Sequence, residues 1–282
     1  MATAIAAITT LLTVAGLAYL LLALWATRSF AHYWTRQPKR AAFAPDVSIL
    51  KPVKGIDSRM YEGFASHCRQ RYEGRFEIVF GFGSMDEPAI AEIERLRSEF
   101  PECDIRLVVC SERLGTSGKV SSLVQMLREA KYEHVLINDS DIRVSPIYLT
   151  RVMESFADAS VGMVTAPYIG RTVESGSGRT LWSRLEALGI STDFLPGVLT
   201  ARMLERGIRF GLGSTLATSK TVLAKIGGLE PLTEYLADDY EMGVRIAGAG
   251  YRVELCGEVV ETTVPAYSFR GFRDHQLRWA RS

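Results

Sequence analysis

The sequence has little of what disulfide-rich, thiolate-metal or nucleic-acid-binding proteins depend on. Its four cysteines show no CxxC spacing, so they indicate neither a disulfide framework nor a zinc site, and reduced thiols in a cytosolic environment fit best. The formal net charge is only +1 with both signs evenly mixed, which gives no case for a nucleic-acid binder. A chain of 282 residues can nevertheless bury one sizeable core, alone or with appendages.

Charge is absent from the start of the chain. No charged side chain precedes Arg28, and residues 5–25 are almost continuously apolar, close to the ~20 residues with which a helix crosses a bilayer. A cleaved signal peptide would carry a positive start and a shorter apolar core, and a buried core helix is the other alternative. Because basic residues follow, we expect a transmembrane helix over 1–27, a basic juxtamembrane linker over 28–45 and a cytoplasmic domain over 46–282.

After the linker, short β-branched runs alternate with stretches of helical period. Strand patterns occur at 47–50, 76–82, 105–110 and 134–138, with helical patterns at 89–100 and 120–130. This rhythm predicts an α/β fold with a mostly parallel sheet and helices on both faces. Later patterns predict strands at 161–166, 214–218 and 251–255, helices at 181–204, 238–247 and 269–279, and a loop at 174–178. The last helix suits either a membrane surface or an ordinary protein surface.

The strand predicted at 134–138 ends abruptly in acidic residues, Asp139 and Asp141. Ligands of open α/β sheets collect outside the carboxyl ends of the strands, where these carboxylates would lie. Two carboxylates one residue apart suit a hard divalent cation that shares its ligands with a substrate diphosphate. The alternative is a polar turn that merely closes the strand.

Three further polar clusters occupy comparable places. Lys54 follows the first predicted strand, Asp86 and Glu87 follow the second, and Asp238 and Asp239 open a predicted helix. Acids at a helix start are also favoured simply as caps, so each cluster alone has a structural explanation. Together, on the rhythm of a nucleotide-binding fold, they indicate a site for an anionic ligand and a cation.

Six stretches carry a resemblance to a known family. They read VSILKPVKG at 47–55, DEPAI at 86–90, GKVSSL at 118–123, DSDIRV at 139–144, LADDY at 236–240 and HQLRW at 275–279. In this order, behind an apolar helix, they resemble the ceramide glucosyltransferases, family 21 of the glycosyltransferases, which have the GT-A fold. The resemblance extends to a bacterial branch that glycosylates hopanoids.

The resemblance implies roles for the acids. Asp86 or Glu87 would lie near the nucleotide, and Asp139 with Asp141 would hold Mg²⁺ or Mn²⁺ against the diphosphate of a UDP-sugar. Asp239 would be the general base that takes the proton of an attacking lipid hydroxyl. One base without an enzyme nucleophile implies a single displacement with inversion, so an α-linked donor would give a β-glycoside.

The resemblance also implies roles for basic and aromatic residues. Arg278 and Trp279 would bind the donor diphosphate and close the acceptor site, and Lys54 and Lys119 would contact donor phosphates. His275 opens the terminal motif where the family more often has Gln or Arg, and it would contribute to the acceptor side together with Asp238.

The sequence departs from the family in ways that leave alternatives open. Glu87 stands where an Asp is usual, and 189–193 lacks a histidine of the eukaryotic ceramide enzymes. The function expected is hexosyl transfer, with glucose first, from a UDP-sugar to a lipid such as ceramide. The alternatives are a hopanoid glycosyltransferase using UDP-GlcNAc, a polysaccharide synthase and a non-catalytic nucleotide-sugar sensor. Family members usually continue into further membrane helices after the terminal motif, so these helices are expected to be missing from this chain.

Overall fold

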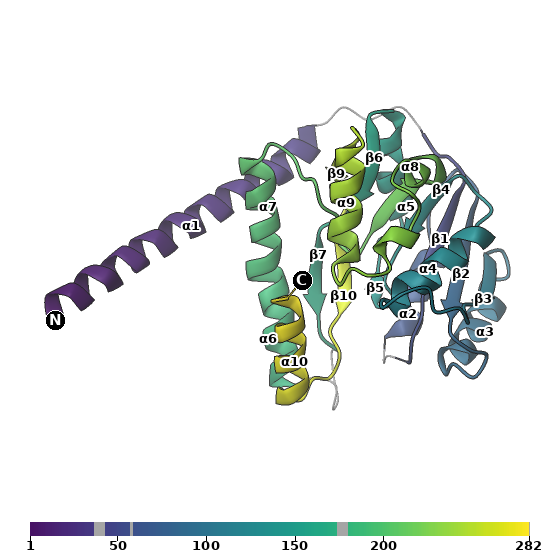
Figure 1. Ribbon diagram of the computed structural model, residues 1–282, viewed down its shortest axis with the longest axis horizontal. Helices are drawn as coiled ribbons and strands as arrows, with labels where there is room; N and C mark the ends of the chain where they lie inside the picture. The colour runs from purple at the N-terminus through teal and green to yellow at the C-terminus, as the bar shows by residue number, and fades with distance from the viewer. Residues whose placement is uncertain (37–42, 57–58, 174–179, 282) are drawn as a thin grey trace.

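The computed structural model describes residues 1–36, 43–56, 59–173 and 180–281, and consists of a long N-terminal helix that projects from an α/β body (Figure 1). Helix α1, Ala2–Arg36, is 35 residues long. Among the described helices it is the one that is long and apolar enough to cross a membrane. The most apolar part of this helix is not buried against the rest of the structure. Residues 28–36 of the expected juxtamembrane segment are helical and belong to α1. The loop expected at 174–178 lies outside the described residues.

The body is built on a seven-stranded sheet with the order β3-β2-β1-β4-β8-β6-β9. Its strands are β1 (Val47–Pro52), β2 (Phe76–Phe82), β3 (Asp104–Val109), β4 (His134–Ile137), β6 (Val161–Thr165), β8 (Leu216–Ser219) and β9 (Arg252–Leu255). All neighbours pair in parallel except β8, which is antiparallel to both β4 and β6. The mostly parallel sheet predicted from the sequence is therefore confirmed.

Helices cover both faces of this sheet because successive side chains of a strand point to opposite sides. Ile49 packs in one apolar cluster with α2 (Met60–Cys68), α3 (Ala89–Glu99) and α5 (Tyr148–Met153). Its neighbour Leu50 packs in a second cluster on the other face, with α4 (Gly118–Glu129), α8 (Lys220–Lys225) and α9 (Asp238–Gly248). Both side chains are fully buried, as expected for strands that are covered twice.

A smaller three-stranded sheet, which the sequence patterns did not predict, lies beside the large one. Its order is β5-β10-β7, formed by β5 (Ile142–Arg143), β10 (Val260–Thr263) and β7 (Tyr168–Arg171). β5 has only two residues, and β7 (YIGR) and β10 (VETT) have few apolar residues, so none of them shows a strand pattern. Because β5 starts directly after Asp141, this sheet helps to place the acidic segment.

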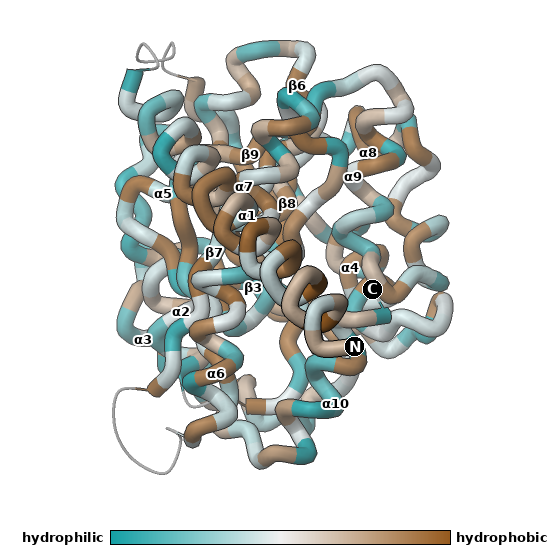
Figure 2. The backbone as a smooth tube through the Cα atoms, turned by 90° about the vertical axis from the view of Figure 1, so that its left-hand side faces the viewer, coloured by the Kyte–Doolittle hydropathy of each residue, from teal (hydrophilic) through white to brown (hydrophobic). Residues whose placement is uncertain are grey.

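The remaining helices stand on one side of the body, next to α1 (Figure 1). The single helix predicted at 181–204 consists of α6 (Leu181–Gly189) and α7 (Leu195–Leu204), joined by a π-helical turn, Ile190–Phe194. Helix α10, Phe269–Trp279, has the predicted bounds and packs beside α6. Figure 2 looks toward this side and shows the apolar helix α1 passing in front of α7.

Candidate active site

A cleft of about 1520 Å³ opens where the parallel strands end. Residues directly after β1, β2, β3 and β4 all line it, as do α6, α7, α9 and α10. This is the edge at which open α/β sheets bind their ligands. The sequence-predicted residues that the cleft brings together are Lys54, Glu87, Lys119, Asp139, Asp141, Asp238, Asp239, His275, Arg278 and Trp279.

Of the two acids predicted to lie near the nucleotide, Asp86 and Glu87, the structure places one in the cleft. Glu87 lines the cleft, and its Oε1 accepts a hydrogen bond from the Gly55 backbone nitrogen at 2.5 Å. Glu87 therefore also holds the loop that follows β1 and carries Lys54. Asp86 is exposed and is not among the described residues that line the cleft.

A buried network of hydrogen bonds fixes the backbone at Asp139. Asn138, fully buried at the end of β4, donates from Nδ2 to the Tyr148 hydroxyl at 3.0 Å and to the Ser214 carbonyl at 2.5 Å. The ammonium of Lys51, also fully buried, donates to the Asp139 carbonyl at 3.0 Å. Burial lowers the pKa of Lys51 to about 7 against the opposing effect of the neighbouring carboxylates. These contacts fix the backbone from which the Asp139 carboxylate enters the cleft.

Asp141 and Asp239 are held by different parts of the fold. The Thr262 hydroxyl, on β10, donates to Asp141 Oδ2 at 2.5 Å, so the small sheet orients this carboxylate. Asp239 lies in the first turn of α9, where its Oδ1 accepts from the Tyr240 backbone nitrogen at 2.9 Å and its carbonyl accepts from the Gly211 backbone nitrogen at 3.2 Å. A carboxylate at this end of a helix is also favoured by the helix dipole.

The carboxylates of Asp139 and Asp239 converge above Gly213. A Cβ atom built on Gly213 would lie 3.3 Å from Asp139 Oδ2 and 3.1 Å from Asp239 Oδ2. Carboxylates from two distant elements thus approach the same glycine, where a side chain would crowd both of them. Glycine is suited to places where a ligand must come close to the backbone.

Lys119 forms ion pairs with two of the acids in the cleft. Its Nζ lies 2.6 Å from Asp139 Oδ1 and 3.9 Å from Asp238 Oδ2. Burial alone would lower the pKa of this ammonium, but the carboxylates outweigh it and raise the pKa, so Lys119 carries its charge. Burial raises the pKa of Asp238, which is only partly offset by Lys119. A mobile cation beside an acid cluster can pair with a phosphate when one binds.

The terminal motif reaches the cleft because α10 is attached to α6 by one buried carboxylate. Glu186 accepts from Gln276 Nε2 at 2.6 Å and contacts His275 Nδ1 at 2.9 Å. Trp279 then packs at 5.3 Å from the His275 ring and 5.6 Å from the Phe194 ring, measured between centroids. Sequence reasoning missed Glu186, because nothing in its local pattern separates it from a surface glutamate.

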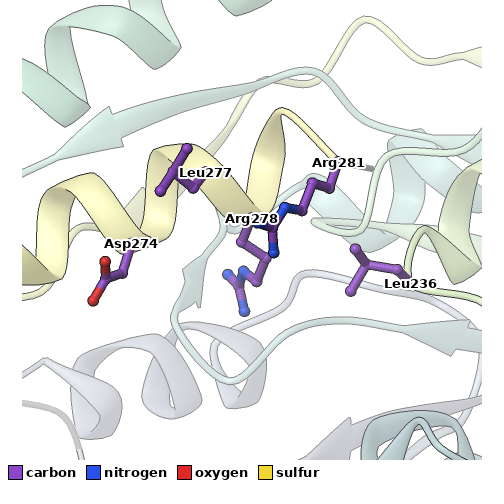
Figure 3. A pocket seen from close by; sticks show the side chains of 5 residues that line it. All are labelled: Leu236, Asp274, Leu277, Arg278 and Arg281. Atoms are coloured by element: carbon purple, nitrogen blue, oxygen red, sulfur yellow. The ribbon is translucent and has the colours of Figure 1, made fainter.

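Arg278 faces two cavities. It lines the main cleft and also a neighbouring pocket of about 450 Å³, which it shares with Leu236, Asp274, Leu277 and Arg281. Figure 3 shows the side chains of Arg278 and Arg281 close together near the end of α10. Two guanidinium groups, of which Arg278 also lines the acid-lined cleft, can hold an anionic group beside it.

The donor set fits a hard divalent cation that is shared with a substrate. Among the described residues, no group of three or more His, Cys, Asp or Glu side chains forms a complete metal cage. Asp139 and Asp141, which the sequence predicts as the metal ligands, nevertheless both line the cleft, and their side-chain donors are oxygens. Mg²⁺ is typically held by one or two carboxylates together with substrate phosphates, and this arrangement supplies that part of the coordination.

Comparisons with known proteins agree with this geometry. The family model described as "Glycosyl transferase family 21" matches residues 8–282. Ceramide glucosyltransferase 3 of Caenorhabditis elegans is 26% identical over 251 residues, which is 86% of this chain and 51% of that protein. An N-acetylglucosaminyltransferase of Bradyrhizobium diazoefficiens is 23% identical over 256 residues, 84% of this chain and 49% of that protein. The chain thus spans about half the length of these curated relatives.

A solved structure shares the fold. A mannosyltransferase from Pyrobaculum calidifontis, in complex with GDP-mannose and Mn²⁺, matches with a TM-score of 0.66 and 23% identity. The match covers 98% of this chain and 72% of that one. The GT-A fold expected from the sequence is therefore confirmed.

Proposed function

Because this chain belongs to glycosyl transferase family 21, we propose that it transfers a hexose from a UDP-sugar to a lipid hydroxyl with inversion at the anomeric carbon. The observation that carries the proposal is the convergence of Asp139 and Asp239 above Gly213, in a cleft at the strand ends. Transfer of this kind needs one carboxylate to take a proton and a cationic surface to receive a diphosphate. The cleft contains both the carboxylates and the cationic side chains that such a transfer requires.

Asp239 is the proposed general base. Its Oδ1 is engaged by the Tyr240 backbone nitrogen, while Oδ2 lies next to Gly213, which also lines the cleft. In our proposal Oδ2 accepts the proton of the acceptor hydroxyl as that oxygen attacks the sugar. No enzyme nucleophile is required, so the displacement occurs in one step and inverts the configuration.

The leaving diphosphate is stabilised by cations of this chain. Lys119, Arg278 and Lys54 line the cleft and would contact the phosphates as negative charge develops. Lys119 would exchange its contact with Asp139 for one with the donor. Asp139 and Asp141 would hold Mg²⁺ or Mn²⁺, which when bound neutralises charge on the diphosphate.

The relatives favour two pairs of substrates. Similarity to a ceramide glucosyltransferase supports UDP-glucose and ceramide as the first pair. Similarity to an N-acetylglucosaminyltransferase over 84% of the chain supports UDP-GlcNAc as the second donor, with a hopanoid as the acceptor we assign to it. We further propose that α1 anchors the protein in the membrane with the domain in the cytoplasm, since Arg28 and Arg36 follow its apolar part.

The test is a transfer assay on the purified protein in detergent with Mn²⁺ or Mg²⁺. Radiolabelled UDP-glucose and UDP-GlcNAc are each offered with ceramide and with a polyhydroxylated hopanoid, and label in the lipid phase is counted. We expect label on ceramide from UDP-glucose, and none with Asp239→Asn although that variant still binds the donor. Undiminished transfer by Asp239→Asn would overturn the role of the base. Absence of label from every lipid, with donor still bound by the wild type, would overturn lipid transfer.

A further inference from the structure

The cleft does not end at the acids, because it continues to the apolar helix α1. Tyr19, in the middle of that helix, is one of the residues that line it. On the opposite wall the lining residues are Ile190, Asp193, Phe194, Gly197, Val198 and Ala201. Their spacing places them on one face of the π-helical turn and α7, so the wall is a largely apolar stripe that carries one carboxylate, Asp193.

Helix α1 meets this stripe at an angle. Its buried residues Ala23, Ala26 and Phe30 lie on one face, and α1 packs there against α7. Tyr19 occupies the same face one turn further toward the N-terminus, beyond the packed contact. Figure 1 shows α1 diverging from α7 in this direction. The two helices therefore form a crevice that widens away from their contact.

Small residues keep the crevice open. A Cβ atom built on Gly197 would meet a single neighbour, the Tyr19 hydroxyl, at 3.8 Å. Ala201 follows one turn later on the same face of α7. A larger side chain at Gly197 would extend into the space toward Tyr19 and fill it.

The inner end of the stripe reaches the proposed reaction centre. The Phe194 ring lies 5.1 Å from the Tyr168 ring and 5.6 Å from the Trp279 ring. Burial and the carboxylates of Asp239 and Asp139 raise the pKa of Tyr168, so its hydroxyl lies within their field. An apolar path thus leads from α1 to the acids, with aromatic side chains at its inner end.

We propose that the crevice between α1 and α7 holds the hydrocarbon chain of the acceptor lipid while its hydroxyl reaches Asp239. A hydrocarbon chain is the occupant that fits, because the outer wall is a helix apolar enough to lie in a bilayer and five of the six side chains on the facing stripe are apolar or glycine. This inference rests on the proposed function and adds the place where the acceptor is recognised. It makes Gly197 and Tyr19 determinants of acceptor chain length rather than of donor binding.

The test uses Gly197→Leu with Gly189→Leu as the matched control. Gly189, at the end of α6, is exposed, and a Cβ built there meets nothing within 4 Å. Transfer is measured with long-chain and short-chain forms of whichever acceptor the wild type glycosylates. Gly197→Leu should raise the KM for the long-chain acceptor at least tenfold and leave the short-chain acceptor and donor affinity unchanged. Gly189→Leu should match the wild type on both.

A second measurement does not depend on how the variant folds. The wild-type protein is irradiated with an acceptor that carries a diazirine in its chain, and the labelled peptides are identified by mass spectrometry. Adducts on α7 and around Tyr19 support the crevice, whereas adducts confined to other elements overturn it. Equal kinetics of the two leucine variants on both acceptors would also overturn it. A wild-type protein that glycosylates no lipid contradicts the proposed function instead, so the two failures can be told apart.

Discussion

The attachment of α10 to the body can be tested at Glu186. This carboxylate is almost fully buried and binds both His275 and Gln276. Helix α10, which is described in full, has no buried residue of its own. Its position therefore depends on this contact and on ring packing, chiefly Trp182 against Phe269 at 4.8 Å. Glu186→Ala should release α10 while the sheet and its two apolar clusters stay folded.

The free energy that docks α10 can be estimated from the two hydrogen bonds that Glu186→Ala removes. Hydrogen bonds to a charged group contribute ~1.5–3 kcal/mol each, so two would contribute about 3–6 kcal/mol to docking. Removing a buried charge also removes its desolvation cost, which favours the lower end. Since ~1.4 kcal/mol is a factor of ten, the fraction of undocked α10 should rise about 100-fold.

Limited trypsin digestion measures this directly, because α10 contains Arg270, Arg273 and Arg278. Cleavage within a docked helix requires local opening, so its rate follows the undocked fraction. We expect cleavage in α10 to accelerate about 100-fold and transfer to fall with it, while the global Tm changes little. Glu205→Ala, at an exposed glutamate that ends α7, is the control and should behave as the wild type. An unchanged cleavage rate for Glu186→Ala would refute the proposed attachment.

Two further outcomes are expected. Asp139→Ala should weaken metal-dependent binding of the UDP-sugar at least tenfold, measured by calorimetry with and without Mn²⁺, and unchanged metal-dependent affinity would contradict the proposed cation site. Acid should destabilise the fold through His67, because burial and the nearby Lys51 lower the pKa of this imidazole to about 3. The unfolded chain binds a proton near pH 6.5 and the folded one does not, so stability is lost by about 1.4 kcal/mol per unit as pH falls from 6.5 toward 3. The free energy of unfolding, measured by urea denaturation at each pH, should fall less steeply with pH in His67→Gln than in the wild type over that window. An identical dependence on pH would show that His67 is not the source of the acid sensitivity.

Much of the fold followed from local pattern. The runs at 76–82 and 269–279 became β2 and α10 with the same bounds, because strand and helix periods are read over neighbouring residues. The strands β5, β7 and β10 were not predicted, because β5 has two residues and the other two contain few apolar side chains, so that pairing with neighbouring strands stabilises them instead. The π-helical turn between α6 and α7 was equally invisible, since it shifts the helix face without changing its composition.

The sequence by itself determined which residue types would gather at the strand ends, because Asp139 follows its strand directly and Asp239 opens its helix. Only the tertiary structure decided what surrounds them. Gly213 brings the two carboxylates to one point, Lys51 lies buried beneath one of them, and Glu186 holds α10 in place. These partners are far apart in the chain, and their approach is set by how the sheets and helices pack, which local pattern does not record.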